Sequence, residues 1–137
     1  MAQDWTNGVK IMRGAALDAK RHDPVAPDRA TIFEFAGTGG GNGAVWMGAV
    51  SLKPGGVIPP HHHGRHEIAI GITSGRMDVK WGESFEHSAE LAPGDFAYFT
   101  PGVPHQERNP SADTRVDFMV VRSDNERIAV KLSDTPA

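Results

Sequence analysis

The sequence predicts an all-β fold, a single sandwich or barrel built from short strands. Its 137 residues suit one domain. Sixteen glycines and ten prolines separate short runs of β-branched and aromatic residues. Turn residues that recur every 8–12 positions or so are typical of a β-sandwich or β-barrel.

The chain divides into an N-terminal arm, a barrel and a tail. Residues 1–28 form the expected arm, whose only candidate helix is a short one around residues 14–20. The barrel covers residues 29–122, and residues 123–137 hold a last strand and a polar tail. We expect strands at residues 30–37, 44–52, 66–73, 76–81, 88–91, 96–100, 103–109, 115–121 and 128–132.

Turns are expected between several of these strands. Ser74 and Gly75 form one, and residues 92–95 another. The glycine-rich stretch 38–42 could instead cradle a phosphate. It does not fit the dinucleotide fingerprint, because Asn42 stands where the third glycine is needed, so we expect a hairpin loop.

Composition excludes several classes of function. The formal net charge is -3 and the basic residues are scattered, which argues against nucleic acid or an anionic membrane as partner. The absence of cysteine excludes disulfides and thiolate chemistry. With no apolar leader and no apolar run of membrane-spanning length, we expect a cytoplasmic protein.

Four of the seven histidines lie within residues 61–66. On an unbroken extended segment His61, His63 and Glu67 would face one side, and His62 and His66 the other. His105 begins another expected strand and could supply a third imidazole. Imidazole and carboxylate ligands suit divalent iron, manganese, nickel or zinc, whereas solvated loop histidines are the alternative.

Two stretches, "GGVIPPHHHGRHE" and "APGDFAYFTPGVPHQERN", resemble the paired motifs of the cupin superfamily. Gly55, His61, His63 and Glu67 fill the first four positions of the first motif. The second motif is filled by Gly94, Gly102, His105 and Asn109, with Thr100 in place of its proline. The resemblance implies a single-domain double-stranded β-helix, or jelly-roll barrel. It also implies that His61, His63, Glu67 and His105 bind a metal ion.

Glu67 departs from the motif. Seven residues separate it from Gly75, where the motif has six, so that counting back from Gly75 reaches Ile68. Either the turn holds one extra residue and Glu67 binds the metal, or Glu67 faces away and three histidines remain. We expect Glu67 to bind, because an isoleucine cannot.

Other side chains could assist at such a site. His66 is a candidate acid or base, and the hydroxyl of Tyr98 could reach the metal. Of Gln106 and Glu107, only one can face the cavity, and the pattern does not choose between them. Asn109 is expected to fix the end of its strand by hydrogen bonds. Aromatic and apolar residues are expected in the core, with a minority lining the mouth of the pocket, namely Trp46, Trp81, Phe96, Tyr98, Phe99, Phe118 and Met119.

The predicted function is that of a metal-binding cupin acting on a small organic molecule. Iron would favour a dioxygenase, and zinc, manganese or nickel a Lewis-acid isomerase or decarboxylase. The alternative is a non-catalytic binding or sensor barrel, since a fold does not dictate a function. The resemblance also implies a homodimer, with the N-terminal arm a candidate to cover a sheet edge.

Overall fold

The computed structural model describes residues 4–6, 9, 11, 13, 29–36, 45–123 and 130–132. In this part of the chain every element is a strand, which confirms the all-β prediction. No helix here is long and apolar enough to cross a membrane. The candidate helix around residues 14–20 and the glycine-rich loop 38–42 lie outside the described residues.

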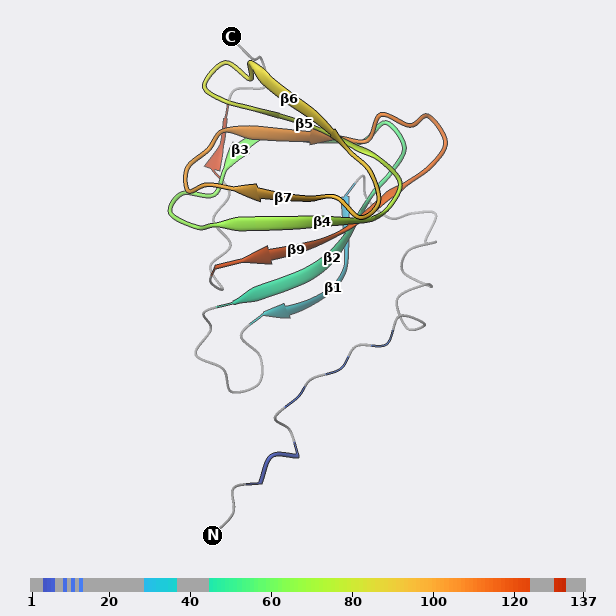
Figure 1. Ribbon diagram of the computed structural model, residues 1–137, viewed down its shortest axis with the longest axis vertical. Coiled ribbons are helices and arrows are strands. Elements are labelled where there is room, and N and C mark those ends of the chain that lie inside the picture. Colours follow the sequence, from blue (N-terminus) through green and yellow to red (C-terminus); the bar gives the residue numbers. More distant parts are fainter. Residues whose placement is uncertain are drawn as a thin grey trace.

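Two five-stranded sheets face each other, and all their strand pairs are antiparallel. The first sheet has the order β1-β2-β9-β4-β7, which can be followed in Figure 1. Its strands are β1 (Arg29–Ala36), β2 (Trp46–Leu52), β9 (Val116–Arg122), β4 (Ile68–Ser74) and β7 (Phe96–Phe99). The second sheet has the order β10-β3-β8-β5-β6. Its strands are β10 (Val130–Lys131), β3 (Val57–His62), β8 (His105–Arg108), β5 (Met77–Trp81) and β6 (His87–Leu91). Since the chain repeatedly crosses from one sheet to the other, the arrangement is a jelly roll.

Nine of these strands lie where the sequence predicts them, and β3 is the exception. Pro59 and Pro60 lie inside β3 and hide it from sequence inspection, because proline lacks the N–H that a sheet needs. The structure accommodates them in an irregularity between Ile58 and His61, where the register with β8 shifts. After this irregularity the register places His61 opposite His105 of β8.

The core forms where the inner faces of the two sheets meet. Its buried members are Trp46, Val50, Leu52, Ile68, Ile70, Ile72, Met77, Val79, Phe99, Val116, Phe118 and Val120. The predicted core places Phe96 and Tyr98 wrongly, since they are 83% and 58% exposed. Met119 is also misplaced, because it is only partly buried on the outer face of β9 and does not belong to the core cluster. Along β7 successive side chains alternate between the two faces, and Phe99 takes the inner one.

Gly75 occupies the expected turn between β4 and β5. Its φ of +80° is a conformation that favours glycine, and a Cβ there would collide with the backbone carbonyl of Arg115. The turn is therefore specified by one residue. After this turn the chain enters the second sheet as β5. Met77 and Val79 of β5 are buried and Trp81 is partly buried, so these alternate side chains face the interior.

Candidate metal centre

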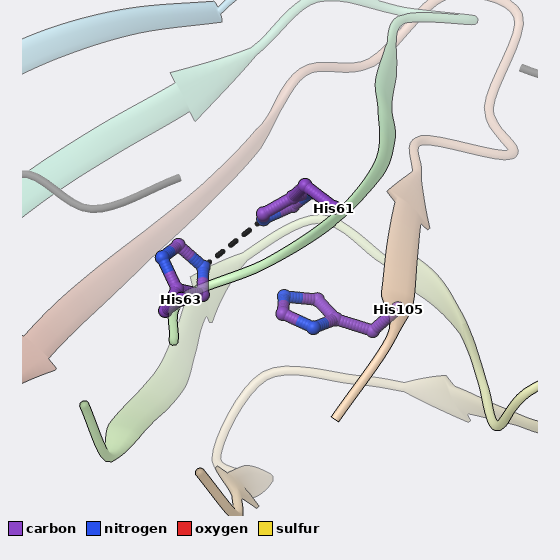
Figure 2. Close-up of side chains that lie close together, drawn as sticks. All are labelled: His61, His63 and His105. Carbon is purple, nitrogen blue, oxygen red and sulfur yellow. Dashed lines mark hydrogen bonds between the residues drawn. The ribbon is translucent and has the colours of Figure 1, made fainter. Parts of the chain in front are cut away.

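Three histidines converge between β3 and β8, as Figure 2 shows. His61 lies in β3, His63 follows it, and His105 begins β8. The antiparallel pairing of the two strands sets His61 directly opposite His105. The strand register thus brings together two residues that are far apart in the sequence.

The three imidazoles present ring nitrogens that lie within 4.8 Å of one another. The Nε2 atoms of His61 and His63 are 3.0 Å apart. The rings of His61 and His105 have centroids 4.3 Å apart, and those of His63 and His105 5.2 Å. His61 and His105 are 9% and 1% exposed, so the cluster is largely withdrawn from solvent.

Backbone carbonyls orient two of the rings. Nδ1 of His61 lies 2.7 Å from the carbonyl oxygen of Pro59, and Nδ1 of His105 lies 2.9 Å from that of Val103. Because a carbonyl can only accept a hydrogen bond, each Nδ1 carries the proton and a neutral ring keeps its lone pair on Nε2. This arrangement is typical of histidines that bind a metal through Nε2. The residues therefore fit a divalent transition metal.

A buried carboxylate lies beside the cluster. Glu107 is 6% exposed, and its Oε1 is 3.4 Å from Nε2 of His105. Burial by itself raises the pKa of Glu107, but the neighbouring His105, with smaller contributions from His61 and His63, outweighs burial and leaves the pKa lowered. Burial likewise lowers the pKa of His105, yet Glu107 and the Val103 carbonyl raise it overall. Between Gln106 and Glu107, the structure turns Glu107 inward.

Glu67 lies outside the histidine cluster, although the sequence predicts it as a ligand. Its side chain is exposed and accepts a hydrogen bond from the hydroxyl of Tyr98. The shared facing with His63 requires an unbroken strand, whereas Gly64, with φ of +60°, turns the chain between them. As β4 starts, Ile68 takes the inward position and Glu67 the outward one. The group that could hold a metal ion is thus made of three histidines, with Glu67 outside it.

The two predicted catalytic residues lie apart from the cavity at the cluster. His66 is buried, and its backbone N–H donates to the carbonyl of His63 at 3.2 Å. Tyr98 is turned to the exposed face of β7, where the bond to Glu67 raises its pKa. Neither lines the cavity onto which His61 and His63 open.

That cavity has a volume of about 410 Å³. Its walls are mainly apolar, and the residues lining it are Trp46, Ile58, Pro59, Pro60, His61, His63, Ile68, Ile70, Glu107, Phe118, Val120, Arg122 and Lys131. Arg122 is 8% exposed and its guanidinium lies over the ring of Trp46, 4.1 Å from the centroid. Sequence inspection missed Arg122, although it continues the inward alternation of Val116, Phe118 and Val120 along β9.

Asn109 closes the strand that carries His105, as the sequence predicts. It is fully buried, and its Nδ2 donates to the carbonyls of Leu52, Lys53 and Thr114 at 3.1, 3.1 and 2.7 Å. Its Oδ1 accepts from the N–H of Ser111 at 3.0 Å. One side chain therefore ties the end of β8 to the end of β2.

The comparisons with known proteins agree with this geometry. The family model described as "Cupin domain" matches residues 48–122, which is more than half of the chain and includes all three histidines. The chain belongs to the cupin family.

Solved structures confirm the cupin fold. Oxalate oxidase in complex with glycolate has a TM-score of 0.69 and 23% identity, over 83% of this chain and 60% of that one. An uncharacterised double-stranded β-helix protein from Klebsiella pneumoniae subsp. pneumoniae has a TM-score of 0.67 and 19% identity, over 91% and 98%. The protein TT1209 from Thermus thermophilus has a TM-score of 0.64 and 25% identity, over 85% and 98%.

This cupin spans about three fifths of the length of the oxalate oxidase chains that it matches. The comparison with curated proteins finds no match. What the comparisons establish is the family and the fold.

Proposed function

We propose that this cupin binds one divalent transition metal ion through His61, His63 and His105, and that it acts there on a small organic molecule. The observation that carries the proposal is the gathering of the three imidazoles, with ring nitrogens within 4.8 Å, beside a cavity of about 410 Å³. Three protein ligands leave coordination positions for a further group, as catalytic metal sites require.

The bound metal would supply either oxygen-dependent redox chemistry, if it is iron, or Lewis acidity for isomerisation or decarboxylation, if it is zinc, manganese or nickel. The protein's own side chains hold the ion and shape its surroundings. His61 and His105 are kept in one orientation by the carbonyls of Pro59 and Val103. Ile68 and Phe118 line the cavity and make part of its wall apolar.

The cavity favours a ligand that carries an anionic group. Arg122 and Lys131 line it together with the histidines, and Trp46 holds the Arg122 guanidinium against its ring. A guanidinium placed in this way matches the two oxygens of a carboxylate. Ile58, Ile68 and Phe118 would contact the ligand's apolar part. We therefore propose a small carboxylic acid, or a similar anion, as the ligand class.

A non-catalytic binding barrel is the second candidate. The observation that favours it is the position of His66 and Tyr98, since neither of these possible acids or bases lines the cavity. A carrier or sensor would hold its ligand with the same histidines and Arg122. It would not need a proton donor at the metal.

Binding and turnover measured together separate the two candidates. The protein loaded with iron, manganese, nickel or zinc would be exposed to small hydroxy acids, oxo acids and dicarboxylates, glycolate and oxalate included. Calorimetry would record binding, while oxygen uptake and product analysis would record turnover, with His63→Ala as the control. Consumption of a ligand that depends on His63 supports an enzyme, and tight binding without consumption supports a sensor. Absence of binding by every metal-loaded form would contradict both.

We also propose a cytoplasmic homodimer. The support for the dimer is the edge strand β7, whose side chains Phe96 and Tyr98 are 83% and 58% exposed. Sedimentation at twice the chain's mass is the expected result, and sedimentation as a monomer would contradict it.

A further inference from the structure

Glu107 is a buried carboxylate whose role the three-histidine site leaves open. It is 6% exposed, and its Oε2 is shielded from solvent without a hydrogen-bond partner in the described part of the chain. A carboxylate taken out of water in this way costs several kcal/mol unless a cation or hydrogen-bond donors compensate. Such a group therefore needs a positive partner at this position.

The strand register places Glu107 on the same side of β8 as the histidine cluster. Along β8 it follows His105 by two residues, so that both side chains point to the same face. On either side it is paired with Ile58 of β3 and Val79 of β5, and Val79 is 3% exposed. The carboxylate thus enters the interior among apolar neighbours, with the imidazoles as its polar surroundings.

Glu107 also faces the metal-binding side of His105. Nδ1 of His105 is oriented by Val103, so Nε2 is the nitrogen available to an ion. Oε1 of Glu107 lies 3.4 Å from this Nε2, yet neither Nε2 of His105 nor Oε2 of Glu107 makes a hydrogen bond within the described residues. Two ligands about 2.1 Å from one ion lie about 3.0 Å apart at a right angle and about 3.4 Å apart at the tetrahedral angle. The observed separations of 3.0 Å for His61 and His63 and 3.4 Å for His105 and Glu107 have these values. Among the described residues only the three histidines have ligand atoms that all lie within 4.8 Å of one another, so a bound ion would draw the Glu107 carboxylate closer to His61 and His63.

We infer that Glu107 is the fourth metal ligand, and that it replaces the carboxylate which Glu67 would have supplied. The inference rests on the proposed metal site. Ile68 lines the cavity where an inward carboxylate of β4 would stand, while Glu67 is turned outward to Tyr98. The carboxylate comes instead from β8, in the other sheet. A site of three neutral imidazoles and one carboxylate suits iron, manganese and zinc.

Zinc and manganese binding to metal-free protein tests this assignment. Glu107→Gln keeps the shape of the side chain but removes its charge, and we expect the Kd for each ion to rise at least about tenfold. Glu67→Gln is the matched control, with an unchanged Kd. Circular dichroism and the melting temperature establish that each variant is folded. Equal affinity for wild type and Glu107→Gln would overturn the inference, as would weaker binding by Glu67→Gln alone.

A crystal structure of zinc-loaded wild type makes the same test without any variant. We expect a Glu107 oxygen about 2.0–2.2 Å from the zinc. A zinc ion held by the histidines alone, or by Glu67, would overturn the inference and leave the proposed function standing. If the wild type binds no metal, the proposed function fails as well, so the two failures are distinguishable.

Discussion

Replacement of Asn109 by alanine should destabilise the metal-free protein by about 3 kcal/mol. The amide carries two N–H hydrogens, shared among the carbonyls of Leu52, Lys53 and Thr114, and one oxygen that accepts from Ser111. The variant therefore loses about three full hydrogen bonds. At about 1 kcal/mol for each bond the loss is about 3 kcal/mol, because water cannot readily reach a fully buried site.

This loss predicts a fall in melting temperature of about 10 °C. A chain of 137 residues has an unfolding entropy of about 0.29 kcal/mol/K at its midpoint, and about 3 kcal/mol divided by this value gives the shift. Urea titration and thermal melts followed by circular dichroism, both on metal-free protein, measure it. Ser111→Ala is the control, because its hydroxyl makes only exposed hydrogen bonds in the same loop, to Asp113 and Thr114, and less than about 1 kcal/mol should be lost. If Asn109→Ala stays within about 1 kcal/mol of wild type, the hydrogen bonds assigned to it do not hold β8 in place.

Three further variants test other parts of the structure. Arg122→Met should keep the Trp46 ring covered but weaken the binding of lactate to metal-loaded protein about tenfold or more. Calorimetry with uncharged lactamide should show no change in affinity, and equal losses for both ligands would refute the role of Arg122 in binding an anion. Gly75→Ala should lower stability in urea by about 2 kcal/mol, because φ is +80° and the added Cβ meets the Arg115 carbonyl; an unchanged midpoint would contradict the strained turn. Tyr98 is the only tyrosine, so phenolate absorbance follows it alone, and Glu67→Gln should lower its pKa by removing the charged acceptor that now raises it. No change in that titration would mean that Glu67 does not face Tyr98.

Much of the fold can be predicted from the sequence, because alternation and turn residues are local signals. The run from Val116 to Arg122 places every second side chain in the interior, and the structure follows it. The strand at Val57–His62 could not be predicted in the same way, since two prolines interrupt its pattern. Its pairing with β8 depends on partners distant in the sequence.

The three histidines of the candidate site can be predicted from the sequence, whereas the directions in which Glu67 and Glu107 face cannot. His61 and His63 lie two residues apart in the first motif, and the spacing of the second motif picks out His105. For Glu67, parity counting fails because one turn residue, Gly64, resets the facing of the side chains before β4. Alternation along a strand places Glu107 on the same face as His105. Which of the two faces is turned inward depends on the pairing of β8 with its neighbours, which the sequence does not show.

Metal analysis of untagged protein is the most direct test of the central claim. Wild type, His61→Ala and His105→Ala would be purified without added metal and analysed for iron, manganese, nickel and zinc. His62→Ala serves as the control, since its ring accepts from the N–H of Gly64 and does not belong to the cluster. We expect close to one metal ion per chain in wild type and in His62→Ala, and its loss in the other two variants. A wild type that contains no metal, and takes up none on reconstitution, would contradict a metal centre at these histidines.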